Sequence, residues 1–286
     1  MAIREVTGSR KDGKWGYIDN AGKEVIPAEF DDARDFSEGL ARVKVSDKWG
    51  FIDRYGEMFI EPVYVDALDF SEGKASVQID GRWGYIDRSG TVMISPEFEF
   101  ASRFREGLAS VKANGRWEYI DASGNTFKNF QFYNSWGFYE GLSNVEINRV
   151  WGFINKKGKV VIKPRYNEAR SFHEGLARVR VGVKWGFINQ SGAAVIKLAF
   201  DEAHDFSEGL AGVKANDKWG FIDRTGNTAI PNRFTNVGVF SEGLAPAALE
   251  VIWGYIDRTG SFVIEPQFDF AGEFREGLAR VWVSDR

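Results

Sequence analysis

Glutamate is the residue type whose spacing in this chain first points to chemistry. Eight glutamates, each followed by glycine, recur at one constant spacing: Glu38, Glu72, Glu106, Glu140, Glu174, Glu208, Glu242 and Glu276. A glycosidase needs one pair of carboxylates in two different environments. Eight equivalent carboxylates do not form such a pair. We therefore expect each of them, as at Glu38 and Gly39, to accept backbone N–H bonds at a bend.

A second acidic position recurs with the same spacing. We call the set of residues at one equivalent position in all the copies a column. Aspartate or asparagine stands at Asp19, Asp53, Asp87, Asp121, Asn155, Asn189, Asp223 and Asp257. Short side chains of this type fold back onto the amides of a turn. One carboxylate per turn is too few for a calcium-binding loop, so we predict a structural role for this column as well.

Other catalytic and metal-binding chemistry lacks the residues that it would need. The chain has no cysteine, which excludes thiolate nucleophiles and cysteine-ligated zinc. Its two histidines, His173 and His204, stand in columns that differ from copy to copy, and neither forms an H-x-x-x-H pair. No phosphate-binding G-x-x-x-x-G-K-[ST] loop occurs. We therefore expect a protein that is not an enzyme, with no catalytic residue, no metal and no cofactor.

The elements that position these columns follow from a tryptophan that returns with this same fixed period of thirty-four. It stands at Trp15, Trp49, Trp83, Trp117, Trp151, Trp185, Trp219 and Trp253. Glycine follows each of them except Trp117, which Glu118 follows. A fixed period of this length indicates a repeat architecture. We therefore expect one repeat domain over residues 1–286, with repeats that begin at these tryptophans and bury them as core residues.

Within one copy, the local pattern indicates strands rather than helices. Residues 40–45 alternate between apolar and charged side chains, as in a half-buried strand. Residues 49–53 form a second segment rich in strand-forming types, and residues 57–60 form a third, which ends before Pro62. For residues 64–73 the pattern leaves a short strand, an irregular crossing and a helical turn open.

The two ends of the chain favour a closed ring over an open array. Residues 6–11, before the first tryptophan, do not resemble the Leu-Ala-x-Val strand of later copies, whereas residues 278–283 are a good copy of it. We therefore predict an all-β fold of eight tandem β-meander repeats, closed as an eight-bladed, propeller-like ring in which residues 278–283 pair beside Trp15–Ile18. The alternative is an open β-superhelix or solenoid, because the repeat is short for a four-stranded propeller blade.

Composition narrows the range of partners. Lys and Arg number 37 and Asp and Glu number 41, a formal net charge of −4 without the basic face that nucleic-acid binding requires. No stretch approaches the 18 apolar residues of a membrane span, so we expect no membrane insertion. Residues 1–10 lack the apolar core of a signal peptide. We expect a soluble protein whose compartment stays open, with the cytoplasm favoured.

The repeated motif resembles that of a known family. The Lys-Trp-Gly-Phe-Ile-Asp run at residues 48–53 and the Phe-x-Glu-Gly-Leu-Ala-x-Val run that begins at Phe36 resemble the bacterial WG (KWG) repeat family, from Trp15 to Val283. The resemblance implies a bacterial, non-enzymatic repeat protein, and the family has no common catalytic residues to carry over. The fourth copy departs most from the motif, at Glu118, Lys128 and the aromatic-rich residues 130–138.

Binding residues are expected in columns that change, because the unchanging columns are needed to build each unit. Trp136 and Trp282 lie outside the periodic tryptophan column and stand in mostly polar columns, so we expect them to face solvent as binding anchors. Tyr133 and Tyr139 flank Trp136 and join this candidate site. The competing interpretation is local repacking of a degenerate fourth copy.

These observations predict a non-enzymatic scaffold that presents a binding surface to another protein. The alternative function is a glycan-binding, lectin-like propeller in which Trp136, or several equivalent grooves, stack on sugar rings.

Overall fold

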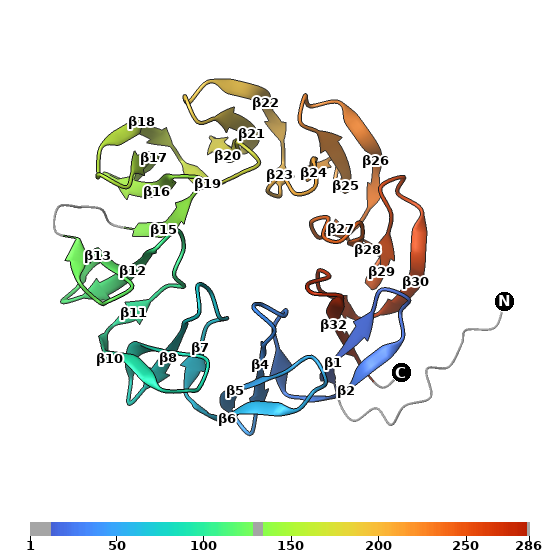
Figure 1. The fold of residues 1–286 in the computed structure, drawn as a ribbon. Coiled ribbons are helices and arrows are strands. Elements are labelled where there is room, and N and C mark those ends of the chain that lie inside the picture. The colour runs from blue at the N-terminus through green and yellow to red at the C-terminus, as the bar shows by residue number, and fades with distance from the viewer. Residues whose placement is uncertain (1–12, 128–133, 285–286) are drawn as a thin grey trace.

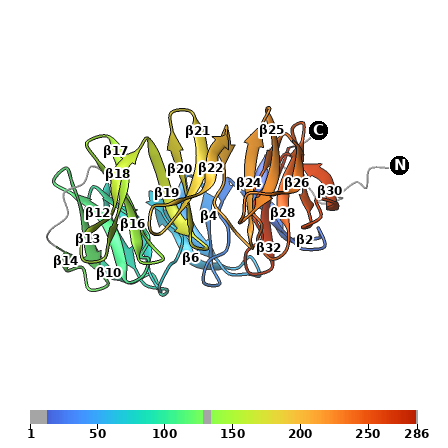
Figure 2. The same ribbon diagram turned by 90° about the horizontal axis from the view of Figure 1, so that it is seen from above.

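The computed structural model describes residues 13–127 and 134–284 and shows a closed ring of eight four-stranded antiparallel sheets (Figure 1). Seen at right angles to the first view, the ring is a short cylinder whose strands run between its two faces (Figure 2). This arrangement is an eight-bladed β-propeller, so the prediction of a closed ring is confirmed and the open superhelix is excluded. Across the described ranges no helix is long and apolar enough to span a bilayer.

Two strands of each blade lie toward the centre of the ring (Figure 1). The innermost strands are β3 (Asp32–Ala33), β7 (Asp66–Ala67), β11 (Phe100–Ala101), β15 (Asn134–Tyr139), β19 (Glu168–His173), β23 (Glu202–Ala203), β27 (Asn236–Val237) and β31 (Phe270–Ala271). The second strands are β4 (Ala41–Val45), β8 (Ala75–Ile79), β12 (Leu108–Ala113), β16 (Leu142–Ile147), β20 (Leu176–Val181), β24 (Leu210–Ala215), β28 (Ala245–Leu249) and β32 (Leu278–Val283).

The other two strands of each blade form its outer half. The third strands, which carry the repeated tryptophans, are β1 (Lys14–Asp19), β5 (Lys48–Ile52), β9 (Arg82–Ile86), β13 (Arg116–Asp121), β17 (Val150–Asn155), β21 (Lys184–Asn189), β25 (Lys218–Asp223) and β29 (Ile252–Ile256). The outermost strands are β2 (Glu24–Phe30), β6 (Met58–Tyr64), β10 (Val92–Phe98), β14 (Thr126–Phe127), β18 (Val160–Tyr166), β22 (Ala194–Phe200), β26 (Thr228–Phe234) and β30 (Phe262–Phe268).

The blades are numbered along the chain, from blade 1 (β3 to β6) to blade 7 (β27 to β30). Blade 8 joins the two ends of the chain in the order β2-β1-β32-β31. Strands β1 and β32 pair along six residues, from Lys14 opposite Val283 to Asp19 opposite Leu278. A stretch from one tryptophan to the next therefore supplies the outer half of one blade and the inner half of the following blade.

The segment that the sequence left open, residues 64–73, contains the two-residue inner strand β7 and the connection to β8. Two short elements let a four-stranded blade fit into a repeat of this length. The innermost strand has only two residues in six of the blades, and a single residue, Asp31, separates the outer strand β2 from the inner strand β3.

The apolar core lies between neighbouring blades. Trp49 and Phe51 of blade 1 share one buried cluster with Ala67, Phe70 and Val77 of blade 2. At the centre of this contact, the rings of Phe51 and Phe70 meet edge to face with their centroids 4.9 Å apart. The same aromatic contact recurs between every pair of neighbours, with centroid distances from 4.7 to 5.0 Å.

The glycine that follows each tryptophan makes room for the outer strand. A Cβ atom added to Gly50 would lie 2.6 Å from the Ile60 carbonyl oxygen and 2.8 Å from the Pro62 nitrogen. No side chain fits at that distance, so the outer strand keeps this path only beside glycine. Blade 3 has Glu118 at this position, and its outer strand is described over Thr126–Phe127 alone.

The glutamate column forms a second ring of contacts. Each carboxylate accepts a backbone N–H bond from the Glu-Gly turn of the next blade, as Glu38 does from Glu72 and Gly73. Glu276 closes the circle through the amide of Gly39, at 2.9 Å. All eight glutamates have a positive φ, between 52° and 56°, a conformation that costs about 1–3 kcal/mol for a residue other than glycine. The expected bonds to backbone amides are thus present, but they run between blades.

The closed ring predicts how a deletion at the C-terminal end affects stability. Deleting residues 278–286 removes β32 and exposes the edges of β1 and β31, since β32 pairs with both. We expect aggregation or a large fall in melting temperature, measured by calorimetry and light scattering. A truncated chain that melts like the parent would contradict the closed ring.

The tryptophan column supplies a second test. Trp219 is 4 % exposed and lies in the core between blades 6 and 7. Trp219→Ala should lower the free energy of unfolding by about 3–5 kcal/mol, as measured by urea denaturation. Trp117, which is only half-buried, is the matched position where alanine should cost less. A loss below about 1 kcal/mol at Trp219 would show that the column is not core.

Candidate binding site at the centre of the ring

The columns that vary between copies meet at the centre of the ring. The 19th, 20th and 22nd residues after each tryptophan lie just beyond, or near the end of, the innermost strand. Together with neighbouring residues they line a central hollow of about 660 Å³. Every blade contributes to its wall: Asp35, Asp69, Arg103, Tyr139, His173, Asp205, Val239 and Glu273.

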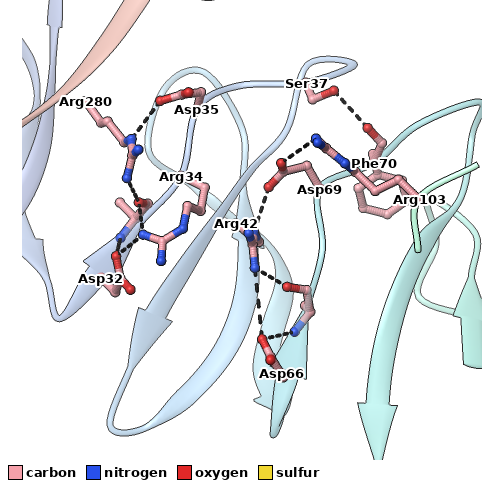
Figure 3. Close-up of polar contacts among 12 residues, drawn as sticks. Asp32, Arg34, Asp35, Ser37, Arg42, Asp66, Asp69, Phe70, Arg103 and Arg280 are labelled. Carbon is pink, nitrogen blue, oxygen red and sulfur yellow. Dashed lines mark hydrogen bonds and ion pairs between the residues drawn. The ribbon is translucent and has the colours of Figure 1, made fainter. Parts of the chain in front are cut away.

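Ion pairs between blades hold part of this wall in place. The Nε atom of Arg42 in blade 1 donates to Asp69 Oδ1 in blade 2 at 2.6 Å, and the same guanidinium donates to the Ala67 carbonyl (Figure 3). Arg103 of blade 3 donates to the other oxygen of Asp69 at 2.8 Å. Asp69 is therefore fixed by guanidinium groups from both neighbouring blades.

The same arginine contact recurs at two other junctions. Arg280 of blade 8 donates to Asp35 of blade 1 at 2.7 Å, which ties the last strand to the first blade across the closure (Figure 3). Arg178 of blade 5 donates to Asp205 of blade 6 at 2.7 Å. Because these side chains are largely shielded from water, removing one partner would leave a partly buried charge unpaired.

A column of serines at one end of the hollow is interrupted in four blades, three of which are consecutive. Ser37 and Ser71 donate to backbone carbonyls of the following blade at 2.8 and 2.7 Å. Blades 3, 4 and 5 carry Arg105, Tyr139 and His173 at this position, and we call these three residues the channel row.

The members of the channel row contact one another. The Arg105 guanidinium lies 5.3 Å from the centroid of the Tyr139 ring, and the Tyr139 and His173 rings are 5.1 Å apart. His173 Nε2 is 4.0 Å from Asp205 Oδ2. In blades 3 to 5 the channel row thus takes the place of the serines and of their hydrogen bonds to the following blade. Its side chains form a continuous surface that is aromatic and cationic.

Arg105 is distinguished by what surrounds its guanidinium. It makes no ion pair with any side chain of the described ranges, whereas Arg103 beside it is paired with Asp69. Its Nε atom is buried and has no hydrogen-bond partner there. A guanidinium carries five N–H donors, so Arg105 retains an unused capacity to bind an anion.

A second hollow, of about 610 Å³, opens beside the channel row, and we call it the blade 3 pocket. Its volume lies within the range of sites that enclose small ligands. Its wall combines apolar and aromatic side chains with four cations and two carboxylates: Leu68, Phe100, Trp117 and Tyr139; Arg42, Arg103, Arg105 and Lys112; Asp69 and Glu99.

The structure places the residues singled out from the sequence in different situations. Tyr139 lines both hollows and belongs to the channel row. Tyr133 lies outside the described residues. The backbone of Trp136 is part of β15, next to Ser135 of the blade 3 pocket, but its side chain lies outside what the structure describes. The other members of the Trp136 column, such as Arg34 and Leu68, are half-buried and do not face open solvent.

Trp282 stays a predicted binding anchor, but it is not freely exposed. It is half-buried in β32, opposite Phe270 on one side and Trp15 on the other. Its partners in the register on both sides are thus aromatic residues of blade 8. The residues that sequence reasoning missed are Arg103, Arg105 and Trp117. The replacement of serine by Arg105 in its column was a signal that could have indicated one of them.

Two titratable groups at the hollow are shifted toward their neutral forms. Burial lowers the pKa of His204 to about 4, and the Arg178 guanidinium acts in the same direction. The His204 ring stacks on Trp219 with centroids 4.5 Å apart. Burial also raises the pKa of Glu273, and the carboxylate of Asp35 raises it further. Both shifts have the same main cause, since burial disfavours the charged form of each group.

The carboxylates at the hollow are engaged in contacts between blades. Within residues 13–127 and 134–284, no three His, Asp or Glu side chains come together in a way that could hold a metal ion. Most of the carboxylates at the hollow are held by arginines, and such pairs position the wall.

Comparison with known proteins identifies the repeat. The family model described as "WG containing repeat" matches residues 15–49, 49–83, 83–117, 151–185, 185–219, 219–249 and 253–281. The unmatched stretch between residues 117 and 151 is the copy that contains Glu118 and Tyr139. No curated protein sequence matches the chain.

Solved structures share the fold at low sequence identity. A eukaryotic initiation factor aligns with a TM-score of 0.58 and 12 % identity, over 92 % of this chain and 87 % of the other. Hsv2 of Kluyveromyces marxianus aligns with a TM-score of 0.53 and 6 % identity, over 79 % and 91 %. Hsv2p of Kluyveromyces lactis gives 0.53 and 8 %, over 79 % and 92 %. Likeness at this level of identity shows the propeller fold alone.

The neutral state of His204 gives a pH-dependent test. Between pH 6.5 and about 4, the unfolded chain binds a proton at this residue and the folded ring does not, so the ring loses stability as the pH falls through this window. His204→Leu introduces the residue type of Leu68 in the same column and removes this loss. Across this range the free energy of unfolding, measured by urea titration, should fall less in the variant than in the parent. The difference between the two falls should reach up to about 3 kcal/mol. Equal pH slopes for variant and parent would refute the assignment.

Proposed function

This chain belongs to the WG-containing repeat family, and we propose that it is a non-enzymatic binding protein whose partner is another protein, docked where the central hollow opens. The observation that carries the proposal is that shared columns and variable columns lie in different parts of the ring. Columns shared by the copies form the contacts between blades, whereas the columns that vary gather at the hollow. Variation at one place on a regular scaffold is what recognition of a specific partner requires.

The rim around the hollow supports this proposal because it is already ordered. The Glu-Gly turns of all eight blades lie in one circle and are joined by the glutamate bonds described above. Long side chains from neighbouring turns reinforce the circle, as Lys156 does by donating to the Glu106 carbonyl at 3.0 Å. A partner that binds such a rim orders few residues of the ring, and this lowers the entropic cost of association.

A second candidate is recognition of a glycan in the blade 3 pocket. Trp117 is half-buried and lines this pocket, whereas Trp49, Trp83 and Trp219 are buried in the core. The rings of Trp117 and Phe100, with centroids 5.6 Å apart, offer an aromatic wall on which a sugar ring could stack.

The test replaces the channel row with the residue that other copies use. The variant Arg105→Ser/Tyr139→Ser/His173→Ser restores the serine of Ser37 and Ser71, so we expect the ring to fold, with melting temperature as the check. Binding partners would be captured with the purified ring, and the dissociation constant of the strongest one measured for each protein. We expect the triple variant to bind at least about tenfold more weakly.

A matched control changes three residues on the outer strands, Val63→Ser/Met93→Ser/Val263→Ser. These side chains are 61, 55 and 55 % exposed and lie far from the hollow along each blade. Their replacement should leave the affinity within about twofold, as for ordinary surface positions. If the control weakens binding and the triple variant does not, the partner docks on the outer strands and the proposal is wrong. A glycan array probed with the parent and with Trp117→Ala tests the second candidate.

A further inference from the structure

The blade 3 pocket has a chemistry that the rest of the hollow lacks, and we propose that it binds the C-terminal carboxylate of a peptide chain. The proposal rests on the proposed function, because it names the part of a protein partner that the ring recognises. Arg105 supplies the guanidinium that binds the carboxylate, and the aromatic wall accepts the last side chain of the peptide.

The first argument is the state of Arg105. Arginine at the wall of this ring is otherwise paired with a carboxylate, as Arg42 is with Asp69 and Arg178 with Asp205. Among the described side chains Arg105 has no such partner, and its Nε atom is buried without a hydrogen bond. A planar guanidinium binds a carboxylate through two parallel N–H bonds, so a carboxylate from outside would complete this site.

The second argument is the balance of charge around the pocket. Three of the four cations in its wall already face three carboxylates, one of which, Asp66, lies just outside the wall. Only the charge of Arg105 is left uncompensated. A single carboxylate neutralises it, whereas a doubly charged phosphate would also be repelled by the acidic side chains of the wall. The facing groups are Arg42 and Arg103 with Asp66 and Asp69, and Lys112 with Glu99.

The third argument is the way into the pocket. The blade 3 pocket and the central hollow share Asp69, Arg103, Arg105 and Tyr139 in their walls, so the two spaces adjoin at the channel row. A ligand that comes from the open end of the ring reaches the pocket through the hollow. A chain end needs room for one strand there, whereas an internal acidic loop needs room for two, which favours the terminal carboxylate over an acidic side chain.

The apolar wall specifies the residue next to that carboxylate. Phe100, Trp117 and Leu68 line the blade 3 pocket and not the central hollow. An aromatic or aliphatic side chain at the last position of the peptide would bury its surface there. The pocket therefore fits a peptide that ends in an apolar residue with a free carboxylate.

The experiment screens a library of random tetrapeptides with free C-terminal carboxylates against the full-length ring. A second library carries C-terminal amides, and a third carries internal acidic or phosphorylated residues with amidated ends. We expect enrichment only from the first library, with aromatic or aliphatic last residues. For the best peptide, amidation and Arg105→Ser should each weaken binding at least about tenfold. Arg105→Lys keeps the positive charge but lacks the planar guanidinium. Its affinity for the peptide should lie between that of Arg105→Ser and that of the parent.

Arg275→Ser is the matched control, since Arg275 stands in the same column in blade 8 but is paired with Glu273 at 3.5 Å. It should leave the affinity within about twofold. Equal enrichment of amidated or phosphorylated peptides, no enrichment over the Arg105→Ser ring, or equal losses at Arg275 and Arg105 would each overturn the assignment. If the channel-row variant loses a protein partner while no free-acid peptide is enriched, only this inference fails. If peptides bind but no protein depends on the channel row, the proposed function fails.

Discussion

The fold depends on one contact, the packing of two steeply inclined aromatic rings between neighbouring blades. A single four-stranded blade is too small to bury its own apolar face, so each blade needs the next one. Because Tyr17 of blade 8 meets Phe36 of blade 1 in the same way as Phe51 meets Phe70, the closure is packed like every other junction. The columns that form this contact cannot change, and those that lie away from it can.

The irregular fourth repeat shows how this constraint and the candidate site are related. Glu118 removes the glycine beside which the other outer strands pass, and the family model leaves the stretch from Trp117 to Trp151 unmatched. The repeats before and after it replace two structural serines by Arg105 and His173. Trp117 and Tyr139 of this repeat line the blade 3 pocket together with the unpaired guanidinium of Arg105.

Much of the architecture could be predicted because its signals are local or strictly periodic. Strand alternation in residues 40–60 and the displaced strand at residues 278–283 were sufficient to predict a closed eight-bladed ring. The exposure of the variable columns was not predictable in this way. Arg34 and Trp282 stand in mostly polar columns, yet both are half-buried, because the surroundings of each are set by strands that are distant in the sequence. Likewise, Arg42 and Asp69 are 27 residues apart, and no sequence pattern relates them.

The pairing in blade 8 also decides how the ring responds to force. Lys14 and Val283, the residues nearest the two chain ends in this ladder, lie opposite each other. Tension applied through the ends would therefore load the hydrogen bonds between β1 and β32 one pair after another, as in opening a zipper, and would not shear them all together. A pull on the two ends would meet only the strength of the residue pair that is opening at that moment.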